Sequence, residues 1–168
     1  MDLFGGGILC CSSWEAEPSY GVPSNPTIDH CLIANNNALS GGGIFCMDES
    51  EAQITNNTIV DNSAFIDGGA VYVQGSSPTI TNNVIAHNSA LDSGGILTWY
   101  GTPSIINNTI VHNRPNGLYL GPTPWTRDQD SSPPVLNNII WENEIYSSSS
   151  VSLEGYDIRF NNIQGNWK

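Results

Sequence analysis

Positive charge is scarce in this chain. Its 168 residues include only 4 Lys and Arg against 16 Asp and Glu, so the formal net charge at pH 7 is −12. Nucleic acid is excluded as a partner, because phosphate binding needs clustered basic side chains that this sequence does not have. An anionic polysaccharide would also be repelled, unless a bound cation bridged the two.

Long apolar runs are absent as well. None approaches the roughly 18 residues of a membrane span, and nothing after Met1 resembles a signal peptide. Strong helix formers are few beside 17 Gly, 10 Pro and 20 Asn, which disfavours an α-helical fold. The length suits one domain, and we expect residues 1–168 to form it.

The sequence repeats a two-part pattern. One block begins with an aliphatic residue, followed by Ile five positions later and Asn eight positions later; its six copies span residues 28–36, 54–62, 80–88, 105–113, 135–143 and 158–166. A second block precedes each copy, as in Gly-Gly-Gly-Ile44-Phe-Cys46. A period near 26 residues identifies a repeat architecture.

The second block alternates apolar and other residues with a period of two, as a strand with one buried face does. No single repeat could bury its apolar face alone, so the copies are expected to stack. We therefore predict an all-β solenoid of about six coils with no sizeable helix. In this arrangement Phe45, Tyr72, Leu97 and Tyr119 should point outward as an exposed apolar stripe.

Asparagines fall into columns along the predicted stack. One column contains Asn57, Asn83, Asn108, Asn138 and Asn161, with Cys31 in the first coil, and its preceding neighbour contains Asn56, Asn82, Asn107 and Asn137; another contains Asn36, Asn62, Asn88, Asn113, Asn143 and Asn166. Asn tolerates a left-handed backbone at corners, and stacked amides can hydrogen-bond from coil to coil. We interpret these columns as structural.

These motifs resemble the repeats of right-handed parallel β-helix proteins in the pectin-lyase-like superfamily. The similarity runs through Gly-Gly-Gly-Ile-Phe-Cys (41–46) and Ile-Thr-Asn-Asn-Thr-Ile-Val-Asp-Asn (54–62) and covers nearly the whole chain. It implies the fold and is weak for activity, since the superfamily includes lyases, hydrolases, epimerases and adhesins. The segment 157–167 is similar to the last coil of many secreted or surface-anchored bacterial members.

Two long insertions interrupt the repeats, at residues 11–25 and 121–134. Both leave the repeat at the same point, so they could flank a groove. Aromatic faces beside carboxylates and amides suit a sugar ring. The predicted carbohydrate groove comprises Trp14, Tyr20, Asp48, Glu49, Glu51, Gln74, Trp99, Tyr100, Trp125 and Arg127. The alternative is that each Trp folds back over its own coil.

A second column carries groups that could bind a transition metal, namely Asp61, His87, His112 and Glu142. Neighbours in it should lie about 5 Å apart, so two imidazoles could chelate an ion. The alternative is a surface ladder in which His separates like charges. Calcium is possible at Asp128 and Asp130 or at the acidic residues 48–51, although solvated acidic loops explain these too. No cofactor is required.

Enzymatic signatures are missing. Pectate lyases use calcium-binding carboxylates with an Arg or Lys base, whereas polygalacturonases use clustered Asp with Gly-His-Gly and Arg-x-Lys segments, and neither set of segments is present. A paired-carboxylate hydrolase stays open among Asp48, Glu49, Glu51, Asp128 and Asp130.

Of the four cysteines, Cys10 and Cys46 fall in one inward column, and buried free thiols are the default interpretation. A Cys10 to Cys46 or Cys11 to Cys31 bridge is the alternative. Neither end of the solenoid carries a polar cap, so the chain is either part of a larger protein or associates with itself through its ends or the outer stripe.

The leading functional hypothesis is a non-catalytic extracellular or cell-surface β-helix domain that presents loops to carbohydrate. The first alternative is a polysaccharide lyase or glycoside hydrolase, complete or truncated. The second is a purely structural or self-assembling solenoid.

Overall fold

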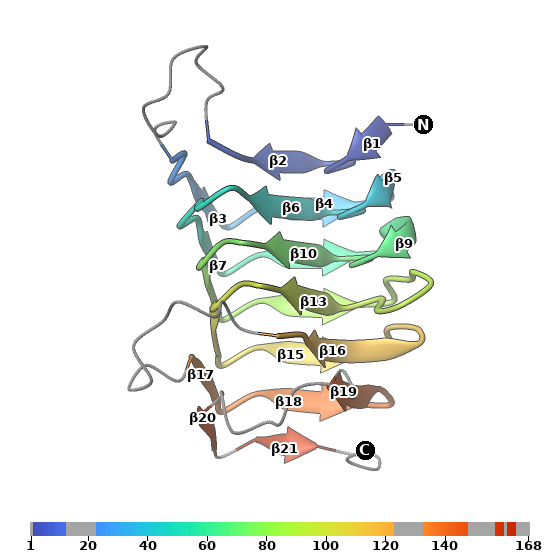
Figure 1. The fold of residues 1–168 in the computed structure, drawn as a ribbon. Helices are drawn as coiled ribbons and strands as arrows, with labels where there is room; N and C mark the ends of the chain where they lie inside the picture. Colours follow the sequence, from blue (N-terminus) through green and yellow to red (C-terminus); the bar gives the residue numbers. More distant parts are fainter. Residues whose placement is uncertain (1, 13–22, 123–132, 148–156, 160, 164–168) are drawn as a thin grey trace.

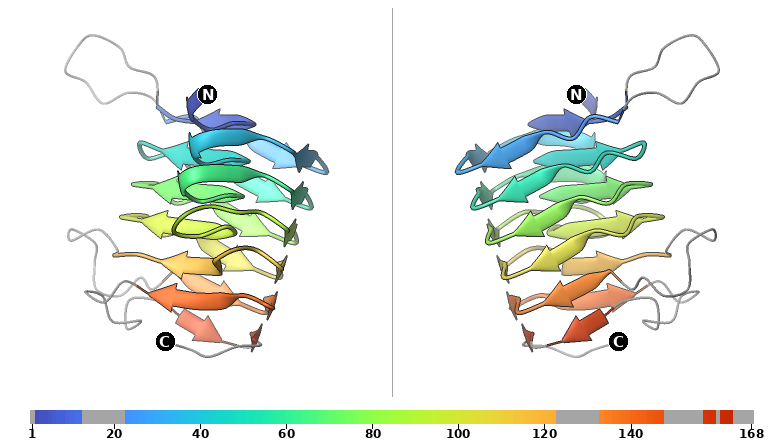
Figure 2. Two further views of the ribbon diagram at one scale, coloured as in Figure 1. Left: turned by 90° about the vertical axis from the view of Figure 1, so that its right-hand side faces the viewer. Right: turned by 90° about the vertical axis from the view of Figure 1, so that its left-hand side faces the viewer.

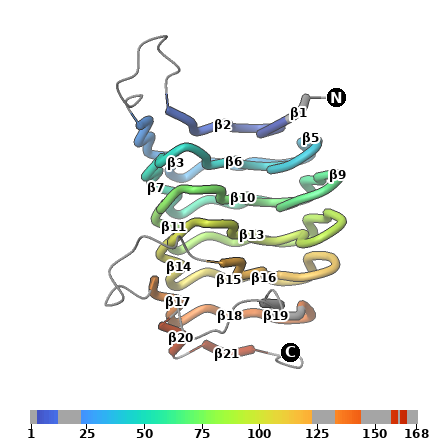
Figure 3. The backbone as a smooth tube through the Cα atoms, viewed as in Figure 1, coloured from blue at the N-terminus to red at the C-terminus, as the bar shows by residue number. Residues whose placement is uncertain are grey.

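The computed structural model describes residues 2–12, 23–122, 133–147, 157–159 and 161–163. Short parallel strands wind around a common axis, so that each coil lies over the next (Figures 1 and 3). Four sheets run along the axis, three of them with six strands each. The expected all-β parallel solenoid is confirmed. No helix in the described part of the chain is long and apolar enough to cross a membrane.

Sheet A is the small one, with three strands, and sheet B forms the front of the stack in Figure 1. Sheet A contains β1 (Asp2–Phe4), β5 (Asn37–Ser40) and β9 (Ser63–Asp67). Sheet B contains β2 (Ile8–Cys10), β6 (Ile44–Met47), β10 (Val71–Gln74), β13 (Ile96–Trp99), β16 (Asn116–Leu120) and β19 (Glu144–Ser147).

Sheets C and D complete each coil, and Figure 2 shows the stack from its two sides. Sheet C contains β3 (Thr27–Asp29), β7 (Gln53–Thr55), β11 (Thr79–Thr81), β14 (Ser104–Ile106), β17 (Pro134–Leu136) and β20 (Asp157–Arg159). Sheet D contains β4 (Leu32–Ala34), β8 (Thr58–Val60), β12 (Val84–Ala86), β15 (Thr109–Val111), β18 (Ile139–Trp141) and β21 (Asn162–Ile163).

The register is the one that the repeats predict. Ile54 pairs with Ile80, which pairs with Ile105, and the same holds for each apolar column. These side chains are fully buried in one cluster that runs through the interior. The strands β7, β11 and β14 of sheet C are three residues long, and because side chains alternate between the two faces of a strand, the central residue of each points into the core.

Buried asparagines close two corners of the second to fifth coils. The Asn57 side chain donates to the Ile28 carbonyl at 2.8 Å and to Asn83 Oδ1 at 3.1 Å, and the same Oδ1 accepts the Asn57 backbone N–H at 2.9 Å. Asn83 repeats this pattern toward Asn108, and Asn62 repeats it toward Asn88. The predicted ladders therefore exist, and they satisfy corner backbone groups that would otherwise be buried without partners.

The outer face of sheet B differs from the prediction. Phe45, Tyr72 and Leu97 form a second buried apolar cluster, with Met47, Trp99 and Tyr119 packed against it, so the expected exposed stripe is wrong for these three residues. In-register stacking is one reason, because each ring covers its neighbour: the Phe45 and Tyr72 rings lie 4.7 Å apart and 9° from parallel. Burial, with Asp67 and Asp92 adding to it, raises the pKa of Tyr72 to about 12.

Candidate functional site

The corner between sheets B and C carries the described part of the predicted carbohydrate groove. After β6, β10 and β13 the chain turns through left-handed residues, with φ of 63° at Glu49, 59° at Gly75 and 52° at Tyr100. The backbone N–H of Glu49 donates to the Gly75 carbonyl at 2.9 Å, and that of Gly75 donates to the Trp99 carbonyl at 3.0 Å. The turns are therefore stacked, and the Glu49 and Tyr100 side chains are exposed on them.

Acidic groups meet polar groups in one depression at this corner. It has a volume of about 340 Å³ and is lined by Pro23, Asn25, Glu49, Glu51, Gly75 and Ser77. Glu49 and Glu51 are exposed, and the Glu51 backbone N–H is held by Asn25 Oδ1 at 2.8 Å. The structure thus brings together two of the predicted groove residues, with Asn25 and Ser77 as polar neighbours that sequence reasoning missed.

Trp99 and Tyr100, the two described aromatic residues of the predicted groove, differ in their exposure. Trp99 is half-buried against the outer cluster of sheet B, 6.4 Å from Tyr119 between ring centroids. Tyr100 lies edge-on to Trp99 at 5.6 Å and is 42% exposed. Among the described residues of the predicted groove, Tyr100 therefore offers the exposed aromatic surface, while Trp99 packs against the outer cluster of sheet B.

The remaining groove residues are placed as follows. Gln74 is exposed at the end of β10, and Asp48 is half-buried in the turn after β6. Four further groove residues and the two predicted calcium ligands of the fifth coil lie outside the described residues: Trp14, Tyr20, Trp125 and Arg127, and Asp128 and Asp130.

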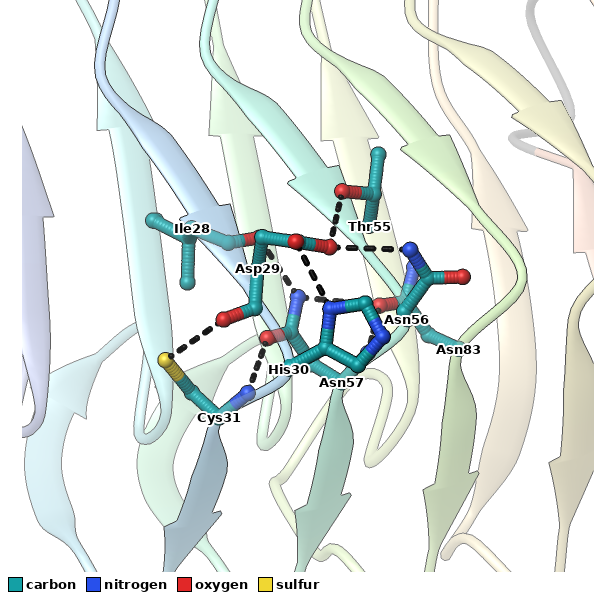
Figure 4. A network of polar contacts seen from close by, with 8 residues as sticks. All are labelled: Ile28, Asp29, His30, Cys31, Thr55, Asn56, Asn57 and Asn83. Carbon is teal, nitrogen blue, oxygen red and sulfur yellow. Dashed lines mark hydrogen bonds and ion pairs between the residues drawn. The ribbon is translucent and has the colours of Figure 1, made fainter.

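A polar network at the corner between sheets C and D was not predicted (Figure 4). Asp29 accepts hydrogen bonds from Thr55 Oγ1 and Asn56 Nδ2, both at 2.8 Å, and lies 2.7 Å from His30 Nδ1. These bonds, that of Asn56 first, lower the pKa of Asp29 to about 2. The column alignment of Asp29 with Thr55, and of His30 with Asn56, was the signal that could have revealed it.

The Asp29 network fixes a corner and assembles no reactive triad. The Cys31 thiol donates to the Asp29 backbone carbonyl at 3.3 Å, whereas the His30 imidazole contacts the Asp29 carboxylate, so sulfur and ring are engaged separately (Figure 4). His30 has φ of 53°, a left-handed backbone that a bond to the preceding carboxylate helps to hold.

The predicted histidine column lies at the corner after sheet D. His87 and His112 stack in parallel, with ring centroids 5.0 Å apart and planes 6° apart, and His112 Nδ1 lies 2.8 Å from Glu142 Oε2. Asp61 occupies the same left-handed position one coil before His87. A depression of about 310 Å³ is lined by the two imidazoles with Asn88, Ser89 and Arg114.

The cysteines are all free thiols. Cys10 and Cys46 are paired in register on β2 and β6, and both side chains are buried in the interior cluster. A hydrogen bond from the Cys46 side chain lowers the pKa of Cys10, whereas that interaction and burial raise the pKa of Cys46. The bridges considered from sequence are therefore not formed in this structure.

The fold and the ladder geometry define a parallel β-helix protein of the pectin-lyase-like class. Residues 17–131 match the family described as "Periplasmic copper-binding protein (NosD)". Since the match covers more than half of the chain, the chain belongs to the NosD family. A family described as periplasmic agrees with the expected location outside the cytoplasm. Neither the curated proteins nor the solved structures contain a match.

The family description raises the question of whether the described residues suit copper. No group of three or more His, Cys, Asp or Glu side chains is positioned to hold a metal ion in the parts of the chain that the structure describes. The parallel His87 and His112 rings do not converge on one point as they stand, and Arg114 adds positive charge beside them. The two thiols of Cys10 and Cys46 match the preference of Cu(I) for soft ligands.

Proposed function

We propose that this NosD-family chain is a non-catalytic β-helix domain that binds carbohydrate along the corner between sheets B and C. The observation that carries the proposal is the exposed Tyr100 ring, which lies on the coil after Gly75 and Ser77 and two coils after Glu49 and Glu51 in the acidic and polar depression. A tyrosine face stacks on the C–H face of a sugar, and carboxylates, amides and hydroxyls bind its hydroxyl groups.

The negative charge of the chain limits which sugars this corner can bind. With a net charge of −12 and two glutamates in the depression, this corner favours neutral or amino sugars and repels uronates. The coil spacing of about 4.8 Å is close to the length of a sugar residue, so successive turns can contact successive units of an extended glycan.

Glycan binding to the full chain, measured by calorimetry against neutral, amino and acidic oligosaccharides, tests this proposal. We expect Tyr100→Asn, which keeps a residue that tolerates φ of 52°, to weaken binding about tenfold or more. Phe65→Asn is the matched control, because Phe65 is an exposed aromatic on sheet A. Equal loss in both variants, or no binding by the wild type, would contradict the proposal.

The same samples address the alternatives. Release of reducing or unsaturated ends, with and without calcium, would replace the binding function by the lyase or hydrolase function. Concentration-dependent sedimentation would support association through the ends of the stack. Absence of both binding and turnover would leave the structural role.

Copper binding is the second candidate function. It is supported by the NosD match over residues 17–131 and by soft donors in the described residues. Copper retained after dialysis of the full chain, measured by elemental analysis, tests it. The histidine column remains a prediction, and a double His87→Ala, His112→Ala variant shows how much copper it holds.

A further inference from the structure

The interior of the solenoid contains two cysteine side chains on adjacent strands, Cys10 on β2 and Cys46 on β6. The column that starts at Cys10 and Cys46 continues through Val73 and Thr98, while the other columns of the interior apolar cluster are aliphatic in the described coils. Cys10 is 1% exposed and Cys46 is 0% exposed. Two thiols thus lie against each other in apolar surroundings, on the two strands at the β2 edge of sheet B.

In-register parallel pairing sets their separation. Neighbouring strands lie about 4.8 Å apart, and side chains in register stand nearly parallel, so the Cβ atoms keep about that distance. A disulfide needs Cβ atoms about 3.8 Å apart, which would pull the two coils together. A metal ion between two thiolates separates the sulfurs by two bonds of about 2.3 Å each, or about 4.6 Å in all. The coil spacing therefore suits a bridging ion better than a disulfide.

The number of donors selects among metal ions. Structural zinc takes four protein ligands, and no group of three candidate ligands is present in the described residues. Hard cations need oxygen ligands, which the aliphatic neighbours of this pair do not supply. Cu(I) is soft and is satisfied by two thiolates.

We infer that Cys10 and Cys46 bind one Cu(I) ion between the first two coils. This inference rests on the copper-binding function proposed above and names the residues that perform it. Each thiol gives up one proton, Cu(I) forms a bond to each sulfur, and the bridged pair carries one net negative charge. No oxidant or reductant is needed, because copper enters and stays as Cu(I).

The two thiols already contact each other, since the Cys46 side chain hydrogen-bonds to the Cys10 sulfur. A single negative charge is easier to bury than two separate thiolates, so the ion relieves the repulsion that doubly ionised thiols would suffer.

Anaerobic titration of the reduced full chain with Cu(I), in competition with a colorimetric Cu(I) chelator, tests the inference. We expect one ion per chain, a thiolate-to-copper absorption band in the near ultraviolet, and a two-sulfur shell by X-ray absorption. A Cys10→Val, Cys46→Val double variant should lose about 100-fold or more in affinity. Valine occupies the next position of the same column, at Val73, so the variant keeps an apolar core; far-UV circular dichroism checks its fold.

Matched controls separate this site from copper binding elsewhere. Cys11→Ser and Cys31→Ser should each bind Cu(I) as the wild type does. Undiminished affinity in the double valine variant would overturn the inference while leaving the copper function in place at another site. No binding by the reduced wild type would overturn both. A Cys10 to Cys46 disulfide that forms in air and persists when Cu(I) is offered with a mild reductant would also overturn the inference.

Discussion

Inner and outer columns one residue apart obey different rules. At the corner after sheet D, Asn62, Asn88 and Asn113 are 1% exposed and identical, because each amide bonds to a neighbouring coil. The preceding column is exposed and holds the chemically different residues Asp61, His87, His112 and Glu142, which share a left-handed backbone. Stacking therefore constrains the inward asparagine and leaves its outer neighbour free to vary.

Of the substitutions considered, alanine at two different glycines should give the largest difference in the free energy of unfolding. A Cβ at Gly95 would lie 2.0 Å from the Gly117 carbonyl oxygen, so Gly95→Ala must displace a coil and should destabilise the protein by about 4 kcal/mol or more. Gly75 has φ of 59° and open space around it, so Gly75→Ala should cost about 1 kcal/mol from backbone strain alone. Urea unfolding followed by circular dichroism measures both, and equal midpoints would disprove the close approach of the coils.

Two adjacent residues on β12, Ile85 and Val84, test the same difference between inward and outward side chains. Ile85 is fully buried, and Ile85→Ala should cost about 3 to 4 kcal/mol through the cavity it leaves. Val84 is 43% exposed on the other face, and Val84→Ala should change the free energy of unfolding by about 0.5 kcal/mol or less. If the two costs were similar, the inward and outward faces of β12 would be wrongly assigned.

The ladder itself is tested by a pair of asparagines. Asn83→Ala removes a donor to the Ile54 carbonyl and an acceptor for Asn57, and should cost about 3 kcal/mol. Asn82→Ala, one residue earlier, should cost about 1 kcal/mol because alanine is strained at φ of 58°, and Asn82→Gly should recover that loss. Chemical denaturation of the three variants gives the ranking, which a costly Asn82→Gly would contradict.

The smallest effect is electrostatic and lies on the outer surface. The pKa of Asp29 is lowered from 3.8 to about 2, so the unfolded chain binds its proton first as pH falls. The stabilisation is complete above pH 4 and is lost as pH falls from about 4 to about 2. Carboxyl titration by NMR should show this low pKa, and Asn56→Ala should raise it. An unchanged value in that variant would exclude the Asn56 amide as the main cause.

The sequence repeat predicted the fold because the same residue types recur in each copy and each copy adds one coil to the stack. The apolar residue at the start of each block and Asn eight positions on recur in every copy, and each becomes a column in the structure, as Ile54, Ile80 and Ile105 show. The outer face of sheet B was mispredicted because a period of two indicates which way a side chain points and does not indicate what covers it. Phe45 and Tyr72 point outward from the coil and are still buried.

The candidate sites were predicted unevenly for the same reason. The histidine stack follows directly from column alignment, and so does the register of Cys10 with Cys46. The separation of Trp99 from Tyr100, one supporting and one exposed, depends on the turn after β13. The Asp29 network joins four side chains from two coils, so column alignment places its members next to each other, whereas their hydrogen bonds depend on the side-chain conformations in the structure.

The stacking, the register and the ladder positions follow from the repeat pattern, because apolar residues that recur at a similar interval can bury their faces only against the neighbouring copies. Contacts between coils decide which outward residues are exposed and which carboxylate is held ionised at low pH. These properties depend on atoms contributed by neighbouring coils, and no single repeat contains them.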